Sequence, residues 1–330
     1  MYLSFISMSR SPKQRAAFKG VITGVSATTQ KSKASICADV LFSGFAYGST
    51  AQEYENLKFY SRSHENRKTF ITSYYNLRNY NRLNNRTDRE IFRDKVRFNQ
   101  TFAEFIGRDW ILINKEQPEQ VFDFIGEHGS AIIKPRFGDS GKDIFFLEKG
   151  DYSTDEMQKV IIDHDGFLAE EVLTNHEDIR VLNPSSLNTV RIITIVTKDG
   201  VEFLYSGIRI GAPDAKVDNI SMGGKVAVID LDTGVIEGGF QSKTTSEVRF
   251  DAGNYSGKAI PQWAELKKFV QKAALVVPGV RYIAWDVAIT PKGPALIEGN
   301  HSSGNTITQA SISIDSPGLR PRLEEILKKC

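Results

Sequence analysis

Cysteine is scarce in this sequence, which has only Cys37 and Cys330 among its 330 residues. These two residues give neither a disulfide framework nor the spacing of a metal site, which fits a reducing compartment. No window holds about 18 uninterrupted apolar residues, so we expect no transmembrane helix. The start, MYLSFISMSRSPKQR, places a short apolar patch before the first basic residue, the reverse of a secretory signal. We therefore expect a cytoplasmic protein.

Two familiar phosphate-binding patterns are also missing. The segment IIKPRFGDSGKDIFFLE, residues 132–148, has a lysine on an apolar run, a glycine-bearing polar turn and a second apolar run. Only two residues separate Gly138 from Gly141, and Asp143 follows Lys142 where a Walker loop needs a hydroxyl. The second apolar run is typical of a strand, not of the helix that a dinucleotide fingerprint requires. The pattern therefore predicts a loop between two strands that covers phosphates as a lid.

The charges are distributed unevenly. The composition, 40% hydrophobic and 25% charged, is that of an ordinary globular protein with room for two or three subdomains. Residues 1–110 hold 18 Lys and Arg against 9 Asp and Glu, a balance of +9, and the other 24 basic and 31 acidic residues give −7. The basic front half indicates an anionic partner, such as a phosphorylated or carboxylated acceptor, nucleic acid or a membrane surface. A solvated helical face explains it equally well.

Nucleic acid is the least favoured of these partners. The stretch YYNLRNYNRLNNRTDREIF interleaves aromatic residues with arginine, as base-stacking surfaces do. It has no accompanying RNA-binding signature, and its NNRTDRE part is more simply a loop that enters a capped helix.

The order of elements indicates a mixed α+β protein with antiparallel hairpins. Residues 20–50 show no clear periodicity, so we assign no element there, whereas 52–106 have apolar residues at helical spacings. Turns at 198–200 (KDG) and 290–293 (TPKG) are typical of hairpins. Two further helices are expected at 154–164 and 261–275. The strand candidates are 131–134, 143–147, 167–172, 189–197, 201–210, 225–231, 282–290 and 294–298.

The acidic stretch RYIAWDVAITPKGPALIEGNHSSGNT, residues 281–306, suggests a metal site. Asp286 lies in one strand, and Glu298 and Asn300 close the next, where residues two apart share a face. Two carboxylates and an amide oxygen form the hard oxygen set that Mg²⁺ prefers. Equally, these side chains could lie at the sheet edge in water, paired with lysine or arginine.

A second set of charged residues precedes this stretch. Lys134 lies on a strand before the glycine loop, the segment GFLAEEVL (166–173) ends a strand in two acids, and Arg191 opens a strand. In this arrangement Lys134 would neutralise the α- and β-phosphates of a nucleotide, the loop amides would cover its β/γ end, and Arg191 would stabilise charge during transfer.

With these residues in this order, the chain resembles the ATP-grasp superfamily, and more closely its sugar-transfer-associated family, found alongside exopolysaccharide biosynthesis genes. The resemblance implies an α+β ATP-grasp fold in which two subdomains grip ATP, preceded by a mainly helical region. The implied boundaries are 1–94 for that region, 95–173 for the small subdomain with the lid loop, and 174–330 for the large subdomain. The segments that carry the match are VDNISMGGKVAVIDLDTG (217–234), LNTVRI (187–192), IPQWAELKKF (260–269) and YIAWDVAITPKGPALIEGN (282–300).

The resemblance also implies an ATP site. Lys134 and Lys95 match the lysines on the phosphates, and Glu170 to Leu173 match the hinge whose backbone pairs with the adenine edge. Asp178, in preference to Glu177, would bind the ribose. The implied cofactor-binding residues are Lys95, Lys134, Gly138, Ser140, Gly141, Lys142, Glu170, Glu171, Val172, Leu173, Asp178 and Arg191, with Lys134 and Arg191 also catalytic.

Asp286, Glu298 and Asn300 match the Mg²⁺ ligands of the family, which are expected to hold two ions. Asp286 stands where many relatives have Glu, so the metal would sit slightly differently. An anionic acceptor is expected nearby, and a lone histidine beside such a site is more often a support than a general base. The implied substrate-binding residues are Asn188, Arg209, Gly223, Gly224, Lys225 and His301.

Three functions follow from this reading. The first is an ATP- and Mg²⁺-dependent ligase that activates a carboxylate as an acyl phosphate for coupling to an amine or another nucleophile, in polysaccharide or cell-surface sugar biosynthesis. The second is a kinase that ends with a phosphorylated sugar or related small molecule, because the same site serves both reactions. The third is a nucleotide-binding scaffold for a glycosyltransferase.

Overall fold

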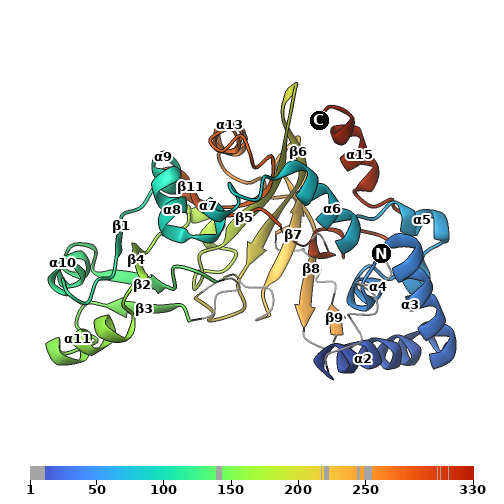
Figure 1. Cartoon of the computed structure of the whole chain (residues 1–330), viewed down its shortest axis with the longest axis horizontal. Helices are drawn as coiled ribbons and strands as arrows, with labels where there is room; N and C mark the ends of the chain where they lie inside the picture. Colours follow the sequence, from blue (N-terminus) through green and yellow to red (C-terminus); the bar gives the residue numbers. More distant parts are fainter. Residues whose placement is uncertain are drawn as a thin grey trace.

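A computed structural model of the chain describes residues 12–138, 143–216, 218, 223–243, 246–248, 255–302, 304, 306–310 and 312–330. These residues form two antiparallel sheets and a helical N-terminal region, with the smaller sheet and the N-terminal helices at opposite ends of the molecule (Figure 1). No helix within the described ranges is long and apolar enough to cross a membrane.

The seven-stranded sheet forms the centre of the molecule. The sequence predicts β5 and β10 residue for residue, because both are continuous β-branched and aromatic runs with turn residues beside them. The KDG and TPKG turns join β5 to β6 and β10 to β11 as antiparallel neighbours, as predicted. In spatial order the strands are β11 (Gly293–Asn300), β10 (Tyr282–Thr290), β5 (Thr189–Thr197), β6 (Gly200–Ile210), β7 (Lys225–Ile229), β8 (Ile236–Lys243) and β9 (Ser246–Val248).

Both faces of this sheet are packed. On one face, Trp285 lies among the aromatic rings of Phe92 and Phe102, and α13 (Trp263–Ala274) completes the core. On the other face, α6 (Ser73–Leu83) and α15 (Arg320–Lys328) cover part of the sheet, and the rings of Tyr80 and Tyr282 stack with centroids 4.0 Å apart. This second face is only partly covered by helices, and its remaining part carries charged side chains.

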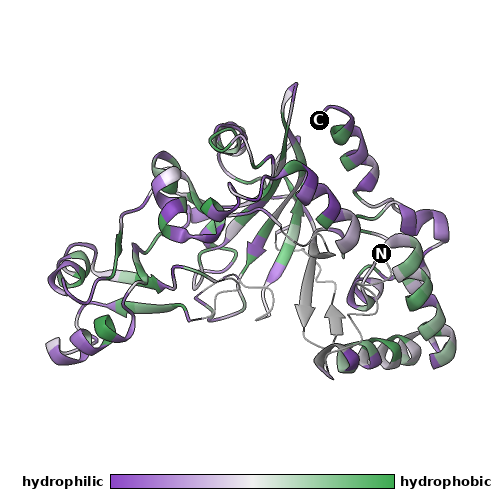
Figure 2. Cartoon of the chain, in the orientation of Figure 1, coloured by the Kyte–Doolittle hydropathy of each residue, from purple (hydrophilic) through white to green (hydrophobic). Residues whose placement is uncertain are grey.

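The four-stranded sheet has the order β1-β4-β2-β3. Two amphipathic helices, α10 and α11, pack on one face over Ala131, Ile133 and Ala169. Figure 2 shows hydrophobic and hydrophilic residues on both helices. The sequence predicted β2, β3, β4 and α11 but not β1 or α10. The bounds are β1 (Trp110–Leu112), α10 (Glu119–His128), β2 (Ser130–Lys134), β3 (Phe145–Glu148), α11 (Thr154–Asp163) and β4 (Leu168–Glu171).

The N-terminal region contains helices where we assigned none. Residues 12–47 form α2 (Pro12–Thr29) and α3 (Lys33–Tyr47), and the Ser32 side chain caps α3 while Gly48 ends it with a φ of 69°. Their helical structure depends on packing against Tyr54 and Phe59, which local periodicity does not reveal. The helical character of 52–106 is confirmed by α4 (Ala51–Asn56), α5 (His64–Lys68), α6, α7 (Glu90–Arg93), α8 (Lys95–Thr101) and α9 (Ala103–Ile106).

The core beneath the large sheet should be sensitive to truncation. Leu266 on α13 is fully buried, so Leu266→Ala should lower the free energy of unfolding by about 2–5 kcal/mol through lost burial and a cavity. Leu275, just after the same helix, is exposed, and Leu275→Ala should change it by less than about 0.5 kcal/mol. Urea denaturation measures both, and equal effects would show that α13 is not packed as described.

Candidate active site

A row of charged side chains crosses the uncovered part of the large sheet. Strand register sets Asp286 opposite Glu298 on β11 and opposite Arg191 on β5. Arg191 binds Asp286 through two parallel contacts, Nε to Oδ1 at 2.7 Å and Nη2 to Oδ2 at 2.5 Å. The row therefore follows from strand pairing, which brings together residues almost a hundred positions apart.

A second arginine reaches the same carboxylate. Arg209 on β6 donates from Nη1 to Oδ2 of Asp286 at 2.8 Å and pairs with Asp218 at 3.2 Å. Burial alone would raise the pKa of Asp286, but the charges of Arg191 and Arg209 hold it well below its usual range. Asp218, which also accepts from Thr189, keeps a raised pKa because burial outweighs the charge of Arg209. Asp286, 2% exposed, is thus ionised and bound to arginine.

Glu298 and Asn300 lie beside this pair at the end of β11. The Glu298 carboxylate accepts from the Asn300 amide at 2.9 Å, and 49% of the Glu298 side chain remains exposed. The surrounding protein shields the Glu298 carboxylate from water, and this desolvation raises its pKa. The nearby Asp286 carboxylate, with which Glu298 shares a hydrogen bond, raises that pKa further. Two carboxylates this close repel each other unless a proton or a cation lies between them. With the amide oxygen, they are a donor set that fits Mg²⁺.

A second buried ionic cluster lies on the small sheet. Lys134 on β2 and Glu170 on β4 point to the face opposite α10 and α11, and Lys134 Nζ lies 2.6 Å from Glu170 Oε2. Glu170 also accepts from Asn99 at 3.0 Å and from Arg108 at 2.8 Å. Burial would raise the pKa of Glu170, but Arg108 and then Lys134 lower it far below its usual range. Both carboxylate oxygens are therefore already occupied by protein donors.

Arg108 connects the two sheets. Its Nη1 donates to the carbonyl of Leu296 on β11 at 2.5 Å, while Nε and Nη2 hold Glu170. Sequence reasoning missed Arg108 and Asn99, since neither belongs to a motif and their partners are far away in the chain. The one available signal was that Glu170 ends an apolar strand, where a buried carboxylate needs a cation.

Lys95 supports the start of the glycine loop. Its Nζ donates to the carbonyls of Pro135 and Gly138, both at 3.0 Å, and its backbone amide binds the Arg136 carbonyl. Gly138 has a φ of 121°, which favours glycine. Of the predicted loop residues, Ser140, Gly141 and Lys142 lie outside the described part of the chain.

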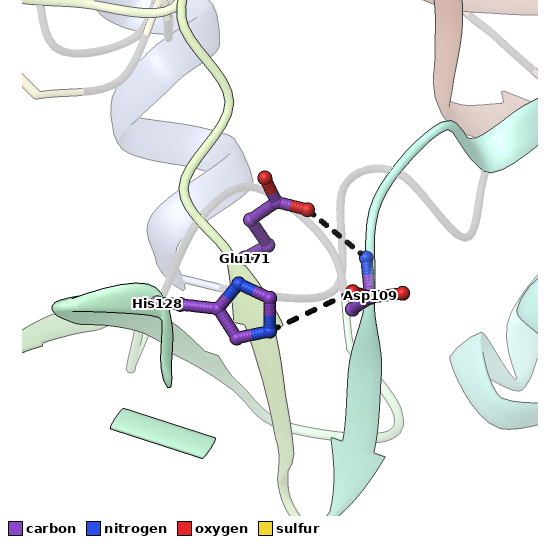
Figure 3. A group of neighbouring side chains, drawn as sticks. All are labelled: Asp109, His128 and Glu171. Carbon is purple, nitrogen blue, oxygen red and sulfur yellow. Dashed lines mark hydrogen bonds and ion pairs between the residues drawn. The ribbon is translucent and has the colours of Figure 1, made fainter. Parts of the chain in front are cut away.

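The structure separates Glu171 from Glu170. Alternation along β4 turns Glu171 to the side of α10, where its carboxylate accepts from the Asp109 amide at 3.2 Å (Figure 3). His128, at the end of α10, lies 3.6 Å from the Asp109 carboxylate. The ligand atoms of these three residues lie within 4.8 Å of one another, but this cluster is away from Lys134.

Val172 and Leu173 follow β4 as a half-buried irregular segment, and Asp178 is exposed in α12 (Glu177–Arg180).

The predicted acceptor residues do not form one group. Asn188 uses its amide entirely within the protein, donating to the Asn183 carbonyl and accepting from Ser186. His301 is buried, and burial, followed by Arg93 and Arg89, lowers its pKa. Lys225 pairs in register with Ile210, so strand alternation puts it on the face opposite Arg209. Arg209 alone among these side chains lies in the charged row, while Gly223 and Gly224 precede β7.

This arrangement agrees with the sequence comparison. Residues 69–328 match the sugar-transfer associated ATP-grasp family, and the chain belongs to that family. Members of the ATP-grasp family are ATP-dependent ligases, and the two antiparallel sheets with a helical N-terminal region are an ATP-grasp fold. The predicted family and fold class are therefore confirmed.

Three solved structures resemble the chain at low sequence identity. The ATP-grasp ligase PsnB, bound to a minimal precursor, Mg and ADP, is 17% identical over 80% of this chain and 68% of its own, with a TM-score of 0.44. D-alanyl-alanine synthetase A from Vibrio cholerae is 10% identical over 73% of this chain and 66% of its own, with a TM-score of 0.46. N5-carboxyaminoimidazole synthetase from Staphylococcus aureus, in complex with ADP, is 11% identical over 66% of this chain and 45% of its own, with a TM-score of 0.40. No curated protein matches the chain.

Removing Arg108 should strongly destabilise the fold. Arg108→Ala leaves the Glu170 carboxylate with one of its buried cations missing, which should lower the free energy of unfolding by about 3–5 kcal/mol. Arg78→Ala, at an exposed arginine on α6, is the control and should change it by less than about 0.5 kcal/mol. Chemical denaturation measures both. A loss below about 1 kcal/mol for Arg108→Ala would show that the cluster does not hold the sheets together.

Proposed function

We propose that this protein is an ATP- and Mg²⁺-dependent ligase that activates a carboxylate as an acyl phosphate and couples it to an amine or another nucleophile. The observation that carries the proposal is the charged row on the large sheet, in which Glu298, Asp286 and Arg191 meet beside Asn300. Its donor set fits Mg²⁺ and its arginines fit phosphoryl oxygens, which is the chemistry of the family to which the chain belongs.

The metal would be held by Glu298 and Asn300, with Asp286 as the third ligand. Bound there, Mg²⁺ supplies charge neutralisation at phosphate oxygens. Arg191 and Arg209 now occupy the Asp286 carboxylate, so at least one oxygen must be released for it to act as a ligand. Glu298, half-exposed and with a raised pKa, is the more accessible ligand.

The nucleotide would lie between the two ionic clusters. Lys134 would contact its phosphates, and Lys95 would position the loop from Pro135 to Gly138. We assign Glu170 to holding Lys134, since its oxygens are already bound by three side chains. The backbone of Val172 and Leu173 would pair with the adenine edge. In this division, 1–94 is a helical region, 95–173 the small subdomain and 174–330 the large one.

In the proposed reaction, an acceptor carboxylate oxygen attacks the γ-phosphorus, and the bond from that phosphorus to the β–γ bridging oxygen breaks. ADP leaves, and the acceptor becomes an acyl phosphate. The amine or other nucleophile then attacks the acyl carbon, inorganic phosphate leaves, and the nucleophile loses a proton. Arg191 would offset negative charge on the transferred group, and Arg209 would bind the anionic acceptor. The family's association with sugar transfer favours an acceptor used in polysaccharide or cell-surface sugar biosynthesis.

Binding of Mg·ATP should stabilise the protein through Lys134. ATP at about 100 times its dissociation constant should add roughly 2.7 kcal/mol, seen as a rise in the unfolding temperature. Lys134→Met should lose most of this rise, because it removes the cation expected on the phosphates. Lys159→Met, at an exposed position on α11, is the matched control and should retain it. Equal rises in the unfolding temperature for both variants would show that Lys134 does not contact the nucleotide.

Turnover should depend on Glu298. Glu298→Gln keeps the shape of the side chain but removes the charge, and it should slow Mg²⁺-dependent ATP turnover on the order of 10²–10³-fold. The control Glu116→Gln, on an exposed loop, should turn over ATP like the parent. Parent activity in Glu298→Gln would contradict the metal assignment. Among the products, ADP with a stable phosphorylated acceptor would indicate a kinase, whereas ATP binding without turnover would indicate a scaffold.

A further inference from the structure

A helical segment precedes the part of the chain that matches the family. The match begins at residue 69, and residues 12–68 contain α2, α3, α4 and α5. Figure 1 places α2 and α3 at the end of the molecule opposite α10 and α11. None of the residues assigned above to nucleotide, metal or acceptor lies in this segment.

Helix α3 is apolar on two sides. Ile36 and Val40 face inward and pack in the core of the N-terminal region. Positions 34, 38, 41 and 45 fall on one side of the helix and are all exposed. They are Ala34, Ala38, Leu41 and Phe45, and Figure 2 shows hydrophobic colouring along most of the helix.

The exposure of this outer side is large. Phe45 is 65% exposed and Leu41 and Phe42 are each 46% exposed. A helix that is apolar all round is ordinarily buried. Here one side has no cover from the described residues of the chain. Ile162, exposed on α11, follows Gln158 and Lys159 at helical spacings and is not part of such a stripe.

Basic side chains outnumber acidic ones around the stripe, although Glu55 of α4 lies beside Gly24 of α2. No acidic residue occurs from Pro12 to Ala38, whereas exposed Arg15, Lys19, Lys31 and Lys33 lie there. The next acid, Asp39, is neutralised by Arg67, whose two terminal nitrogens bind its oxygens at 2.6 and 2.9 Å.

The side of α3 that carries Phe42 has no excess charge. It borders a hollow of about 680 Å³ where Glu65 pairs with Lys68 and Glu324 with Arg320. The excess of positive charge therefore lies at Lys19 on α2 and at Lys31 and Lys33 at the turn that leads into α3.

We propose that this apolar stripe on α3, with the basic residues of α2 and the α2–α3 turn beside it, is a docking surface for an anionic lipid bilayer. Exposed Leu and Phe on one side of a helix insert at the headgroup boundary, and flanking Lys and Arg attract anionic headgroups. A second copy of the chain would bring the same positive charges against each other, which disfavours a symmetric dimer through this face. The inference does not depend on the proposed ligase activity.

The test uses the full-length chain and vesicles made of phosphatidylcholine alone or mixed with phosphatidylglycerol at roughly two to one. We expect the protein to sediment with the anionic vesicles at least about tenfold more than with the neutral ones, and less as salt is raised. Phe45→Asp should reduce sedimentation about tenfold, since it puts a negative charge into the stripe. Ile162→Asp, an equally exposed apolar position on α11, should bind like the parent.

Two charge-reversal variants separate the electrostatic attraction to anionic headgroups from the insertion of apolar side chains. Lys19→Glu with Lys33→Glu should weaken binding to anionic vesicles, whereas Lys149→Glu with Lys159→Glu, on exposed residues of the small subdomain, should not. Every variant should keep the parent's unfolding temperature and its stabilisation by Mg·ATP, which shows that folding and the nucleotide site are intact.

Three results would overturn the proposal. One is equal sedimentation of the parent with neutral and anionic vesicles, or with neither. Another is parent-like vesicle binding by Phe45→Asp. The third is a parent dimer that Phe45→Asp dissociates without any vesicle binding, because the stripe would then be an interface between two copies.

Discussion

The buried pairing of Glu170 with Arg108 and Lys134 is the constraint on which the relation between the two sheets depends. A carboxylate buried this deeply is costly unless cations and donors satisfy both of its oxygens. Arg108 does so while its remaining nitrogen binds a carbonyl of β11, so one guanidinium joins an edge strand of the large sheet to β4. The same carboxylate fixes Lys134 on the face away from α10 and α11. The cluster therefore both joins the two sheets and sets the position of Lys134.

The charged row on the large sheet also pairs a buried carboxylate with cations, but a second carboxylate in the row is only partly compensated. Asp286 is satisfied by Arg191 and Arg209, whereas Glu298 accepts from the Asn300 amide, lies 3.8 Å from the nearer Arg191 nitrogen and is repelled by the Asp286 carboxylate. The charges of the row thus compensate one another, but incompletely at Glu298, whose pKa is raised. A cation between Glu298 and Asp286, with phosphate oxygens drawing the arginines, would relieve this repulsion without moving a strand.

The sequence was sufficient where local pattern and tertiary environment agree. The strands around Arg191 and Asp286 are continuous β-branched runs with clear turns, so their ends were predicted and the pairing of Asp286 with Glu298 followed. Periodicity failed for α2 and α3, because the residues that hold them in place are Tyr54 and Phe59 from later elements. The contacts of Arg108 could not be predicted either, because its partners lie far away in the sequence and the residues next to Arg108 carry no signal of them.

Strand alternation explains how one face of the large sheet can hold both a packed core and a row of charged side chains. Along β10, Tyr282 packs under α6 and α15, and Asp286, four residues further on the same face, joins the charged row. Along β5, Ile193 and Arg191 divide in the same way. Core packing fixes the apolar residue two or four positions away from each charged residue on the same strand, so the charged side chains have fixed positions as well.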